Sequence, residues 1–368
     1  VEVVGKIFAH DKISDIVDAI KFAKKYSDLV ILSGGLGPTI DDLTKEAIAE
    51  YLKKDLVIDE LHRKEMERKF SERGIEVLSK NLKEVSVVTD SIVFYNEPGI
   101  APAFYIDGIS AFPGVPVELK NMFPKYLDYL KKEFGLNKKL IIRDFIVWGI
   151  PESTLEEKII GYFNDQKVFL EFLVKDYGII VRLVTDEDNK ELVEELGKKI
   201  YSTLGEAVLY EENRPSQEVL IEKLIKEKMT ISLAESCTGG MIAEKLVSVS
   251  GASQVFEEGL VTYSNEAKMK RLGVNKVTLD KYGAVSSETV EEMLKGLSTD
   301  VGIAVSGIAG PLGGTEEKPV GTVYIGIKLN EELYINRHLF KGDRERIRIR
   351  ACYTAINNLL QILRKRGM

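Results

Sequence analysis

Residues 28–42 read DLVILSGGLGPTIDD, and this stretch decides the fold predicted for the first part of the chain. A short apolar run from Asp28 to Leu32 leads into a glycine-rich turn, after which we expect a helix as far as Leu52. Before it, residues 2–9 are predicted to form a strand, and apolar side chains recur at helical spacing from Ile13 to Ala23. A strand, a glycine-rich loop and a helix in succession are typical of βαβ units, so we expect an α/β domain with a mainly parallel sheet.

Three predicted domains follow from the pattern along the rest of the chain. Apolar stretches alternate with charged helical ones between residues 140 and 210, which indicates a small α+β module. The sequence EENRPS at residues 211–216 is the best linker, and a second α/β unit follows it. The predicted domains are residues 1–137, 138–210 and 211–368. Further strands are expected at residues 86–95, 109–112, 229–234, 301–306 and 322–327, and helices at residues 216–228 and 239–249 and from Val117.

The composition is that of a globular protein with a sizeable core: of 368 residues, 44% are hydrophobic and 30% are charged. A net charge of −7 disfavours general binding to the phosphate backbone of nucleic acids. Two cysteines, Cys237 and Cys352, are too few for a disulfide framework and suit a reducing cytoplasm. No apolar run reaches the roughly 18 residues of a membrane span. We therefore expect a cytoplasmic protein that binds neither nucleic acid nor a membrane. Because the chain begins with Val1 rather than Met, we also expect a natural segment to precede it.

The glycine-rich turn is the first candidate site. Backbone N–H groups at the start of a helix attract anions, and glycines let the backbone approach a ligand closely, so a phosphate or pyrophosphate cradle is one interpretation. An ordinary tight turn is the other, with Thr39 as the N-cap of the helix and Asp42 as its capping-box partner. The residues proposed to hold a nucleotide pyrophosphate are Ser33, Gly34, Gly35, Gly37 and Thr39.

Two aspartates accompany this turn. Asp11 follows the first predicted strand, and Asp42 follows the glycine-rich turn. Ligands of open α/β sheets bind at the carboxyl ends of the strands, so the two side chains are expected at the same edge. Their carboxylate oxygens could share a divalent cation such as Mg²⁺ or Co²⁺.

The second candidate site is the sequence AESCTGG at residues 234–240, between a predicted strand and a predicted helix. It presents Ser236 at the edge of the sheet, beside N–H groups near Gly239 and Gly240 that could stabilise an oxyanion. A helix cap rich in serine and threonine is the structural alternative. Cys237 is a rival nucleophile, because a thiolate at a helix N-terminus would be activated.

A serine nucleophile needs a base. The three histidines, His10, His62 and His338, lie in no suitable motif, so a Ser-His-Asp triad is not expected. Lys268 closes the sequence TYSNEAK at residues 262–268, where a strand ends and a helix begins. It could act as the base if burial lowers its pKa, whereas a solvated surface lysine is the common alternative.

Together these motifs resemble the CinA family (competence/damage-inducible protein A). Residues 33–42, 81–83 and 112–116 are similar to its molybdopterin-binding-like N-terminal domain, which is associated with ADP-ribose pyrophosphatase activity. In related proteins, aspartates that match Asp11 and Asp42 contact a metal beside a nucleotide pyrophosphate. The family's opening Gly-x-Glu-Leu-Leu motif is missing here. The middle module resembles a KH-type fold but lacks the Gly-x-x-Gly loop that binds RNA, so a structural spacer or dimer contact is expected.

Five motifs in the last third resemble the C-terminal CinA domain, which is a nicotinamide mononucleotide deamidase. They are residues 234–240, 261–268, 283–286, 306–311 and 317–323. The resemblance implies that Ser236 attacks the nicotinamide carboxamide and that Lys268 accepts its proton. Tyr263 would relay protons or orient Lys268, and no metal or other cofactor would be required. Water would then hydrolyse the acyl-enzyme to nicotinic acid mononucleotide.

The phosphate of this substrate also needs a site. Glycines in the long loop after residue 306 permit close approach of the backbone, and residues 341–348 resemble the family's Gly-Asp-Arg-x-x-x-Arg stretch. An arginine there could hold a phosphate bidentately, although a solvated basic helix face explains the same residues. The residues expected to bind substrate are Thr238, Gly239, Gly240, Asn265, Gly307, Gly310 and Arg348.

We therefore expect a homodimeric amidohydrolase of pyridine nucleotide salvage whose partners are nicotinamide mononucleotide and ADP-ribose. Its predicted fold class is α/β, with a molybdopterin-binding-like N-terminal domain, a KH-like α+β module and a C-terminal α/β deamidase domain. The alternative is a non-catalytic nucleotide- or pterin-binding scaffold that acts in competence or DNA repair. Ammonia release from nicotinamide mononucleotide distinguishes the two.

Overall fold

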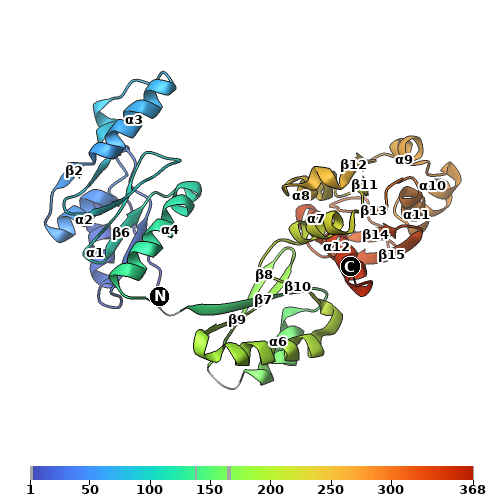
Figure 1. Ribbon diagram of the computed structural model, residues 1–368. Coiled ribbons are helices and arrows are strands. Elements are labelled where there is room, and N and C mark those ends of the chain that lie inside the picture. Colours follow the sequence, from blue (N-terminus) through green and yellow to red (C-terminus); the bar gives the residue numbers. More distant parts are fainter. Residues whose placement is uncertain (1–2, 137–138, 164–166, 368) are drawn as a thin grey trace. The chain divides into compact units, whose positions relative to one another are not determined.

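The computed structural model describes residues 3–136, 139–163 and 167–367, and the chain forms two compact units (Figure 1). The first unit is Val1–Asn137 and the second is Lys138–Met368. Among the helices of the described residues, none combines the length and the hydropathy that crossing a bilayer requires.

The first unit is built on a four-stranded sheet of mixed direction. Its order is β1 (Val30–Ser33), β6 (Ile109–Phe112), β5 (Ala103–Ile106) and β4 (Ile92–Phe94). Only β1 and β6 are parallel, so the expectation of a mainly parallel sheet is corrected here. The physical reason is the turn Asp107-Gly108, whose φ angles of 47° and 77° suit a tight hairpin and force β5 and β6 to run antiparallel.

Helices α1 and α2 pack on this sheet with the apolar side chains predicted from the sequence. Ile16, Val17 and Ile20 of α1 join Ile48 of α2 and Phe104 of β5 in one core cluster. Helix α4 buries Met122, Tyr126 and Leu130 in a second cluster. The remaining elements of this unit are α1 (Ile13–Ala23), α2 (Thr44–Leu52), β2 (Leu56–Ile58), α3 (Glu60–Glu72), η1 (Ser79–Lys83), β3 (Ser86–Val88) and α4 (Pro116–Glu133).

Two strand predictions are corrected in this unit. Residues 3–10 form no regular structure and are exposed, and Glu2 lies outside the described residues. A strand persists only where a neighbour satisfies its backbone N–H and C=O groups, and β1, at the edge of its sheet, pairs with β6 alone. The strand expected at residues 86–95 is two strands, because a turn with Asp90 at a φ of 67° separates β3 from β4.

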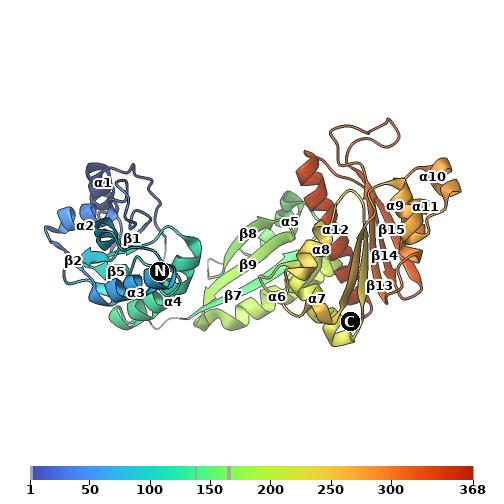
Figure 2. The ribbon, with the colours of Figure 1, turned by 90° about the horizontal axis from the view of Figure 1, so that it is seen from above.

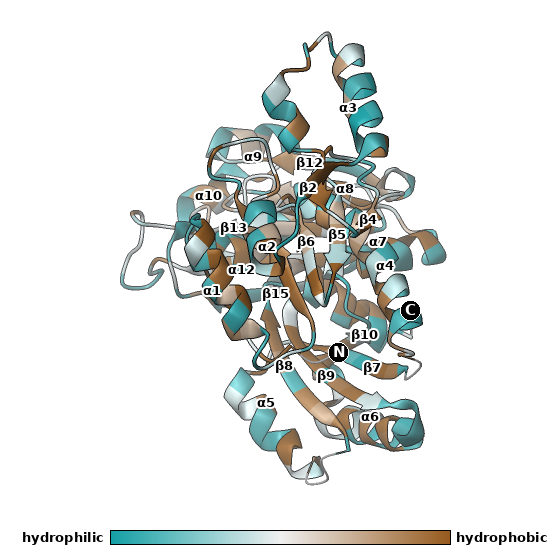
Figure 3. Cartoon of the chain, turned by 90° about the vertical axis from the view of Figure 1, so that its left-hand side faces the viewer, coloured by the Kyte–Doolittle hydropathy of each residue, from teal (hydrophilic) through white to brown (hydrophobic). Residues whose placement is uncertain are grey.

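The second unit begins with an antiparallel sheet of order β10-β7-β9-β8, whose strands are mostly hydrophobic (Figure 3). Helices α5 and α6 pack on one face around Phe145, Val181 and Ile200. On the other face, Ile146 and Ile180 belong to the core of the residues that follow. The elements are β7 (Leu140–Val147), α5 (Glu152–Ile159), η2 (Ile160–Tyr162), β8 (Phe169–Lys175), β9 (Gly178–Asp186), η3 (Glu187–Asn189), α6 (Lys190–Leu204), η4 (Gly205–Ala207) and β10 (Val208–Glu211).

A five-stranded sheet of order β12-β11-β13-β14-β15 and the helices packed on it form the rest of this unit. Figure 2 shows these helices on the two sides of the sheet. The first three strands are parallel and the last two are antiparallel to their neighbours. Helices α7, α8 and α12 cover one face, and α9, α10 and α11 cover the other. The strands are β11 (Ile231–Glu235), β12 (Phe256–Val261), β13 (Val301–Gly307), β14 (Thr322–Leu329) and β15 (Glu332–Leu339). The helices are α7 (Ser216–Glu227), α8 (Met241–Val247), η5 (Ala252–Gln254), α9 (Asn265–Leu272), α10 (Lys276–Tyr282), α11 (Ser287–Lys295) and α12 (Arg344–Lys365).

The polar residues of interest follow the carboxyl ends of the parallel strands in this sheet. Ser236 comes directly after β11, and Thr262 comes directly after the neighbouring strand β12. Parallel strands bring their carboxyl ends to the same edge, which is where open α/β sheets bind ligands. The fold therefore places the two predicted catalytic motifs side by side.

Candidate active site

Ser236 and Lys268 meet at the edge of the five-stranded sheet. The Nζ atom of Lys268 lies 3.1 Å from the Oγ atom of Ser236. Both residues are buried, with 8% of Ser236 and 1% of Lys268 exposed. Ser264 caps the start of α9 by accepting the Ala267 N–H, which fixes the first turn of the helix that carries Lys268. The lysine is therefore not the solvated surface group that the sequence left open.

The surroundings of Lys268 suit a neutral amine. Its Nζ donates to the backbone carbonyls of Thr262 at 2.7 Å and Tyr263 at 3.5 Å. Burial lowers the pKa of Lys268, because the ammonium form is poorly solvated there. A neutral amine has two N–H bonds and one lone pair. In the ammonium form, Nζ donates to Ser236 Oγ as well as to the two carbonyls. The neutral amine can keep its two N–H bonds on the carbonyls and direct its lone pair to the Ser236 hydroxyl.

The turn that carries Ser236 is held by backbone hydrogen bonds and by a buried carboxylate. The Ser236 N–H donates to the Val305 carbonyl at 2.9 Å, and the Gly239 N–H donates back to the Ser236 carbonyl at 3.1 Å. The Glu235 carboxylate accepts the Gly240 N–H at 3.0 Å. The N–H groups of Gly239 and Gly240 themselves are thus engaged, so an oxyanion donor must come from a neighbouring residue of this turn.

Two other donors lie beside the serine. Within the ranges that the structure describes, the backbone N–H groups of Cys237 and Thr238 form no hydrogen bond to another residue. They directly follow the serine on the same turn. Cys237 lines the cavity described below, whereas Thr238 is fully buried and does not, so the Cys237 N–H is the donor available to a negatively charged oxygen at this site.

A cavity of about 210 Å³ opens onto Ser236. Small apolar side chains form part of its wall, those of Ala284, Val285 and Ala309. Polar groups line the rest, including Ser236, Lys268, Tyr263, Ser306 and Arg344. The combination of an apolar wall and a few convergent polar groups is typical of small-molecule sites.

Several predicted substrate residues do not line this cavity. Gly307 does, but Asn265 is exposed at the start of α9. Thr238 is buried, and its carbonyl accepts a hydrogen bond from Arg348 Nη2 at 2.8 Å. The Gly310 carbonyl accepts from Arg344 Nη1 at 2.8 Å.

Arg344, not Arg348, is the arginine that reaches the cavity. Besides Gly310, its guanidinium contacts the Tyr263 hydroxyl, which accepts from Nη2 at 3.1 Å. Tyr263 is 62% exposed, so this pair lies at the solvent side of the cavity. Arg344 belongs to the same stretch as Arg348, but spacing alone did not indicate which of the two faces the site. The sequence likewise did not predict that the cavity is lined by Ser306, Ala284 and Val285, although all three lie within the family motifs.

This geometry disfavours Cys237 as the nucleophile and the histidines as the base. Cys237 also lines the cavity but is 5% exposed, and burial raises the pKa of its thiol to about 12. Such a thiol is protonated near neutral pH, and the thiolate is the reactive form. None of the three histidines lines the cavity.

The glycine-rich turn of the first unit is held firmly by its neighbours. Gly34 and Gly35 have φ angles of 100° and 71°, a conformation that favours glycine. The Gly34 N–H donates to the Phe112 carbonyl at 2.9 Å, and the Thr44 hydroxyl donates to the Gly34 carbonyl at 2.8 Å. Ser33 ends β1 immediately before this turn.

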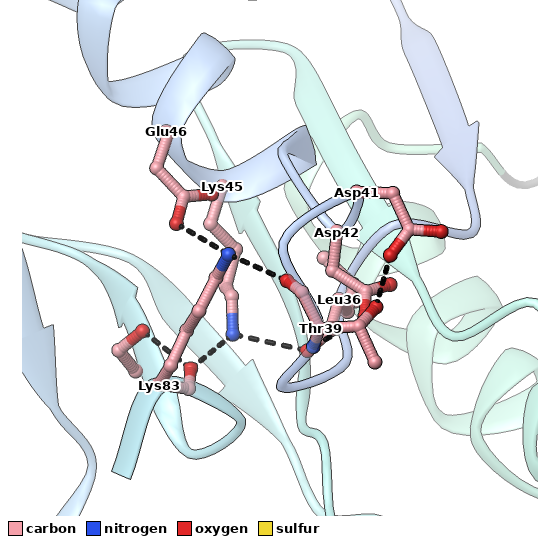
Figure 4. Close-up of polar contacts among 8 residues, drawn as sticks. Leu36, Thr39, Asp41, Asp42, Lys45, Glu46 and Lys83 are labelled. Atoms are coloured by element: carbon pink, nitrogen blue, oxygen red, sulfur yellow. Dashed lines mark hydrogen bonds and ion pairs between the residues drawn. The ribbon is translucent and has the colours of Figure 1, made fainter. Parts of the chain in front are cut away.

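The side chain of Asp42 bonds back to Thr39 in the segment that follows the glycine-rich turn (Figure 4). Its Oδ2 atom accepts the Thr39 N–H at 2.9 Å and also the Thr39 hydroxyl. Burial raises the pKa of Asp42, but the hydrogen bonds from Thr39 outweigh this and leave the pKa below its usual value. Helix α2 begins only at Thr44, so the prediction of Thr39 as its N-cap is corrected. The turn from residue 39 to residue 43 precedes the helix because Asp42 bonds back to Thr39 instead of starting the helix.

A buried lysine joins this turn to a distant segment. Lys45 is 1% exposed, and its Nζ donates to the Leu36 carbonyl at 3.0 Å and to the Lys83 carbonyl. Burial lowers the pKa of Lys45 to about 8. The Lys83 ammonium donates to the Thr39 carbonyl at 3.1 Å and pairs with Glu46 (Figure 4). Sequence reasoning missed Lys45, whose position inside an ordinary helix gave no signal.

Asp11 and Asp42 are not brought together by any hydrogen bond in the described residues. Asp11 is exposed in the segment before α1, whereas the Asp42 oxygens face Thr39. Over the described part of the chain, no cluster of three or more His, Cys, Asp or Glu side chains is arranged to hold a metal. A cation at this turn would therefore need oxygen atoms from its ligand, as Mg²⁺ commonly does with phosphates.

Three family descriptions match successive parts of the chain. "Probable molybdopterin binding domain" matches residues 1–132, "Damage-inducible protein CinA KH domain" matches residues 143–209, and "CinA C-terminal domain" matches residues 213–363. These matches confirm the resemblance and the α/β fold class drawn from the sequence.

The chain is also similar to proteins of known name and to solved structures. A CinA-like protein of Fusobacterium nucleatum is 50% identical over 369 residues, covering 100% of this chain and 91% of the relative. A crystal structure of a CinA superfamily protein from Escherichia coli is 34% identical with a TM-score of 0.39, covering 40% of this chain and 88% of that one. A competence/damage inducible protein of Agrobacterium tumefaciens is 37% identical with a TM-score of 0.38, covering 40% of this chain and 96% of that one.

Proposed function

The chain belongs to the CinA family, and from this premise we propose that its C-terminal site is an amidohydrolase that converts nicotinamide mononucleotide to nicotinic acid mononucleotide and ammonia. The observation that carries the proposal is the 3.1 Å contact between Ser236 Oγ and a buried Lys268 Nζ. A hydroxyl becomes a useful nucleophile when an adjacent base removes its proton. The deamidation itself uses no cofactor in this proposal.

The steps follow from the positions of these groups. Neutral Lys268 takes the Ser236 proton as Oγ attacks the carboxamide carbon, giving a tetrahedral intermediate with a negatively charged oxygen. The N–H group of Cys237, which lines the cavity, stabilises that oxygen. Lys268 then passes the proton to the amide nitrogen, the C–N bond breaks, and ammonia departs. The acyl group remains bound to Ser236 as an ester. A water molecule, deprotonated by Lys268, hydrolyses the ester, which frees the carboxylate product and the serine.

Arg344 is the group proposed to bind the substrate phosphate. Its guanidinium lies at the solvent side of the cavity, and the planar set of five N–H donors suits a phosphate. Arg344→Gln should raise KM for nicotinamide mononucleotide by roughly 10- to 100-fold and change kcat little, because a charged hydrogen bond to the substrate is lost in ground and transition states alike. The measurement is steady-state ammonia release.

The neighbouring Arg346 gives a matched control, because its guanidinium bonds Asp176 at 3.0 Å and does not line the cavity. Arg346→Gln should leave KM within about twofold of the parent, as surface ion pairs contribute little. The parent and Arg344→Gln should have the same KM for nicotinamide riboside, because this substrate lacks the phosphate. A KM for nicotinamide mononucleotide that is unchanged in Arg344→Gln would show that the phosphate binds elsewhere.

We also propose that the glycine-rich turn of the first unit binds a nucleotide diphosphate such as ADP-ribose with Mg²⁺ or Co²⁺. It is supported by the left-handed conformations of Gly34 and Gly35 and by the nearby lysines Lys45 and Lys83. Calorimetric titration with ADP-ribose and Mg²⁺ should show binding that Asp42→Asn weakens at least about tenfold, since Asp42 holds the turn through Thr39.

Asp41→Asn is the control for this experiment, because it removes the neighbouring carboxylate, which accepts the Thr39 hydroxyl but, among the described residues, no backbone N–H of the turn. It should weaken binding less than Asp42→Asn does. If Asp42→Asn lowers the melting temperature but keeps the affinity, Asp42 only stabilises the turn.

The assembly and location also stay predictions. A homodimer is supported by large apolar side chains that are exposed on strands of the antiparallel sheet, where Leu140 and Ile142 are each 56% exposed and Phe169 is 65% exposed. The cytoplasmic location rests on the cysteine content of the sequence. A non-catalytic nucleotide-binding scaffold remains the alternative, which the absence of ammonia release would favour.

A further inference from the structure

Glu235 places a buried carboxylate immediately before the proposed nucleophile. It is 1% exposed, and in the described residues it forms no ion pair with a lysine or arginine. Its Oε2 accepts the N–H groups of Gly240 at 3.0 Å and Ile242 at 3.2 Å, and its Oε1 accepts the Ala243 N–H at 2.9 Å. Three backbone N–H groups therefore bond to this carboxylate at the start of α8.

The backbone of the same residue is linked to the proposed base. The Glu235 carbonyl accepts the Thr262 N–H at 2.8 Å. The Thr262 carbonyl in turn accepts Lys268 Nζ at 2.7 Å. Glu235 thus fixes the segment after Ser236 with its side chain and the segment before Lys268 with its main chain.

The carboxylate thus holds the serine turn together with the Ser236 N–H bond to Val305 and the Arg348 bond to the Thr238 carbonyl. The turn between Glu235 and α8 is short and contains Gly239 and Gly240 with φ angles of 63° and 90°, which alone would leave it free to take other conformations. Removing an acceptor from buried N–H groups is costly, because each donor is left without a partner. Loss of this acceptor favours a rearrangement of the turn that carries Ser236, because the donors then need other partners.

We propose that Glu235 is a positioning residue of the amidase reaction, which holds the Ser236 turn in register with Lys268. The inference rests on the proposed function, since it assigns Glu235 to that same dyad. It predicts an effect on the chemical step and not on substrate affinity, because Glu235 does not line the cavity.

Glu235→Gln tests the proposal with little change in volume. The carboxamide has one acceptor oxygen, and its NH₂ group faces backbone N–H donors. With the full chain, kcat for ammonia release should fall about 10- to 100-fold, while KM stays within about threefold of the parent. The assay is run below the melting temperatures of all variants.

Asp300→Asn provides a matched control at the other end of the same strand. The Asp300 carboxylate accepts the Thr230 N–H at 2.8 Å and the Thr230 hydroxyl at 2.9 Å, immediately before β11. This variant should lower the melting temperature but keep kcat within about twofold of the parent. A similar loss of kcat in both variants would mean that Glu235 acts only through the overall stability of the protein. That result would overturn the proposal.

A second readout needs no nicotinamide substrate. A fluorophosphonate labels activated serines, and the rate of Ser236 labelling, followed by mass spectrometry, should fall about tenfold or more in Glu235→Gln. Unchanged kcat and labelling rate in this variant would overturn the proposal. A parent protein that is labelled but releases no ammonia refutes the proposed substrate, and the labelling rates alone then decide the role of Glu235. A parent that shows neither reaction overturns both. If Glu235→Gln does not fold, Glu235→Asp is measured in the same way.

Discussion

Ser236→Ala should lose ammonia release from nicotinamide mononucleotide by about a thousandfold or more. The reason is that Ser236 Oγ is the hydroxyl bonded to Lys268 Nζ at the cavity, so the variant leaves the base without a nucleophile. The substitution removes one buried hydroxyl and should change the melting temperature little. The measurement is the steady-state rate of ammonia formation by the full chain.

Cys237→Ala is the matched control, since it alters the adjacent residue on the same turn. This variant should stay within about tenfold of the parent, a change of about 1.4 kcal/mol or less in the barrier. The buried thiol, with its pKa raised to about 12, should not supply a thiolate near neutral pH. An inactive Cys237→Ala together with an active Ser236→Ala would mean that the enzyme uses the cysteine.

Lys268→Arg should be nearly as damaging as Lys268→Met, with a loss of roughly 10²- to 10⁴-fold in kcat. A guanidinium cannot give up its proton near neutral pH, so arginine keeps the positive charge but not the base. In the parent, activity should rise with pH as Lys268 becomes neutral. Because burial lowers the pKa of Lys268, this rise should occur below the pH at which an exposed lysine titrates.

Lys270→Arg is the control on the same helix, because Lys270 is exposed. It should keep the activity and the pH profile of the parent. A Lys268→Arg variant with more than a tenth of the parental rate, or with the parental pH profile, would contradict the assignment of Lys268 as the base.

The sequence predicted best those features that depend on local patterns. Apolar spacing placed α1 at Ile13–Ala23, and the short run at residues 109–112 is β6. Both are decided within a few residues by which side chains face the core. The same reasoning missed β8, because residues 169–175 mix apolar and charged side chains and have no pronounced alternation.

The direction of the strands was the main error in the fold. The βαβ pattern at residues 28–52 suggested a parallel sheet, but Asp107-Gly108 turns the chain directly from β5 into β6. This dipeptide is a strong hairpin signal, and its positive φ angles fix the outcome. The error therefore came from a turn signal that was present in the sequence and not used.

The sequence predicted the two motifs of the site but not the contacts between their residues. Spacing within residues 234–240 and 262–268 indicated the two motifs, and only the pairing of β11 with β12 brings them together. Nothing local shows that Glu235 engages the Gly240 N–H, or that Arg344 and not Arg348 faces the cavity. These contacts depend on how α8 and α12 pack, and single-sequence patterns do not specify that packing.

The most direct test of the central claim is to incubate the full chain with nicotinamide mononucleotide and a chelator and to measure both products. The Ser236–Lys268 mechanism predicts ammonia and nicotinic acid mononucleotide in equal amounts, at a rate that the chelator does not change. No ammonia, or ammonia formed only after a divalent cation is restored, would contradict it.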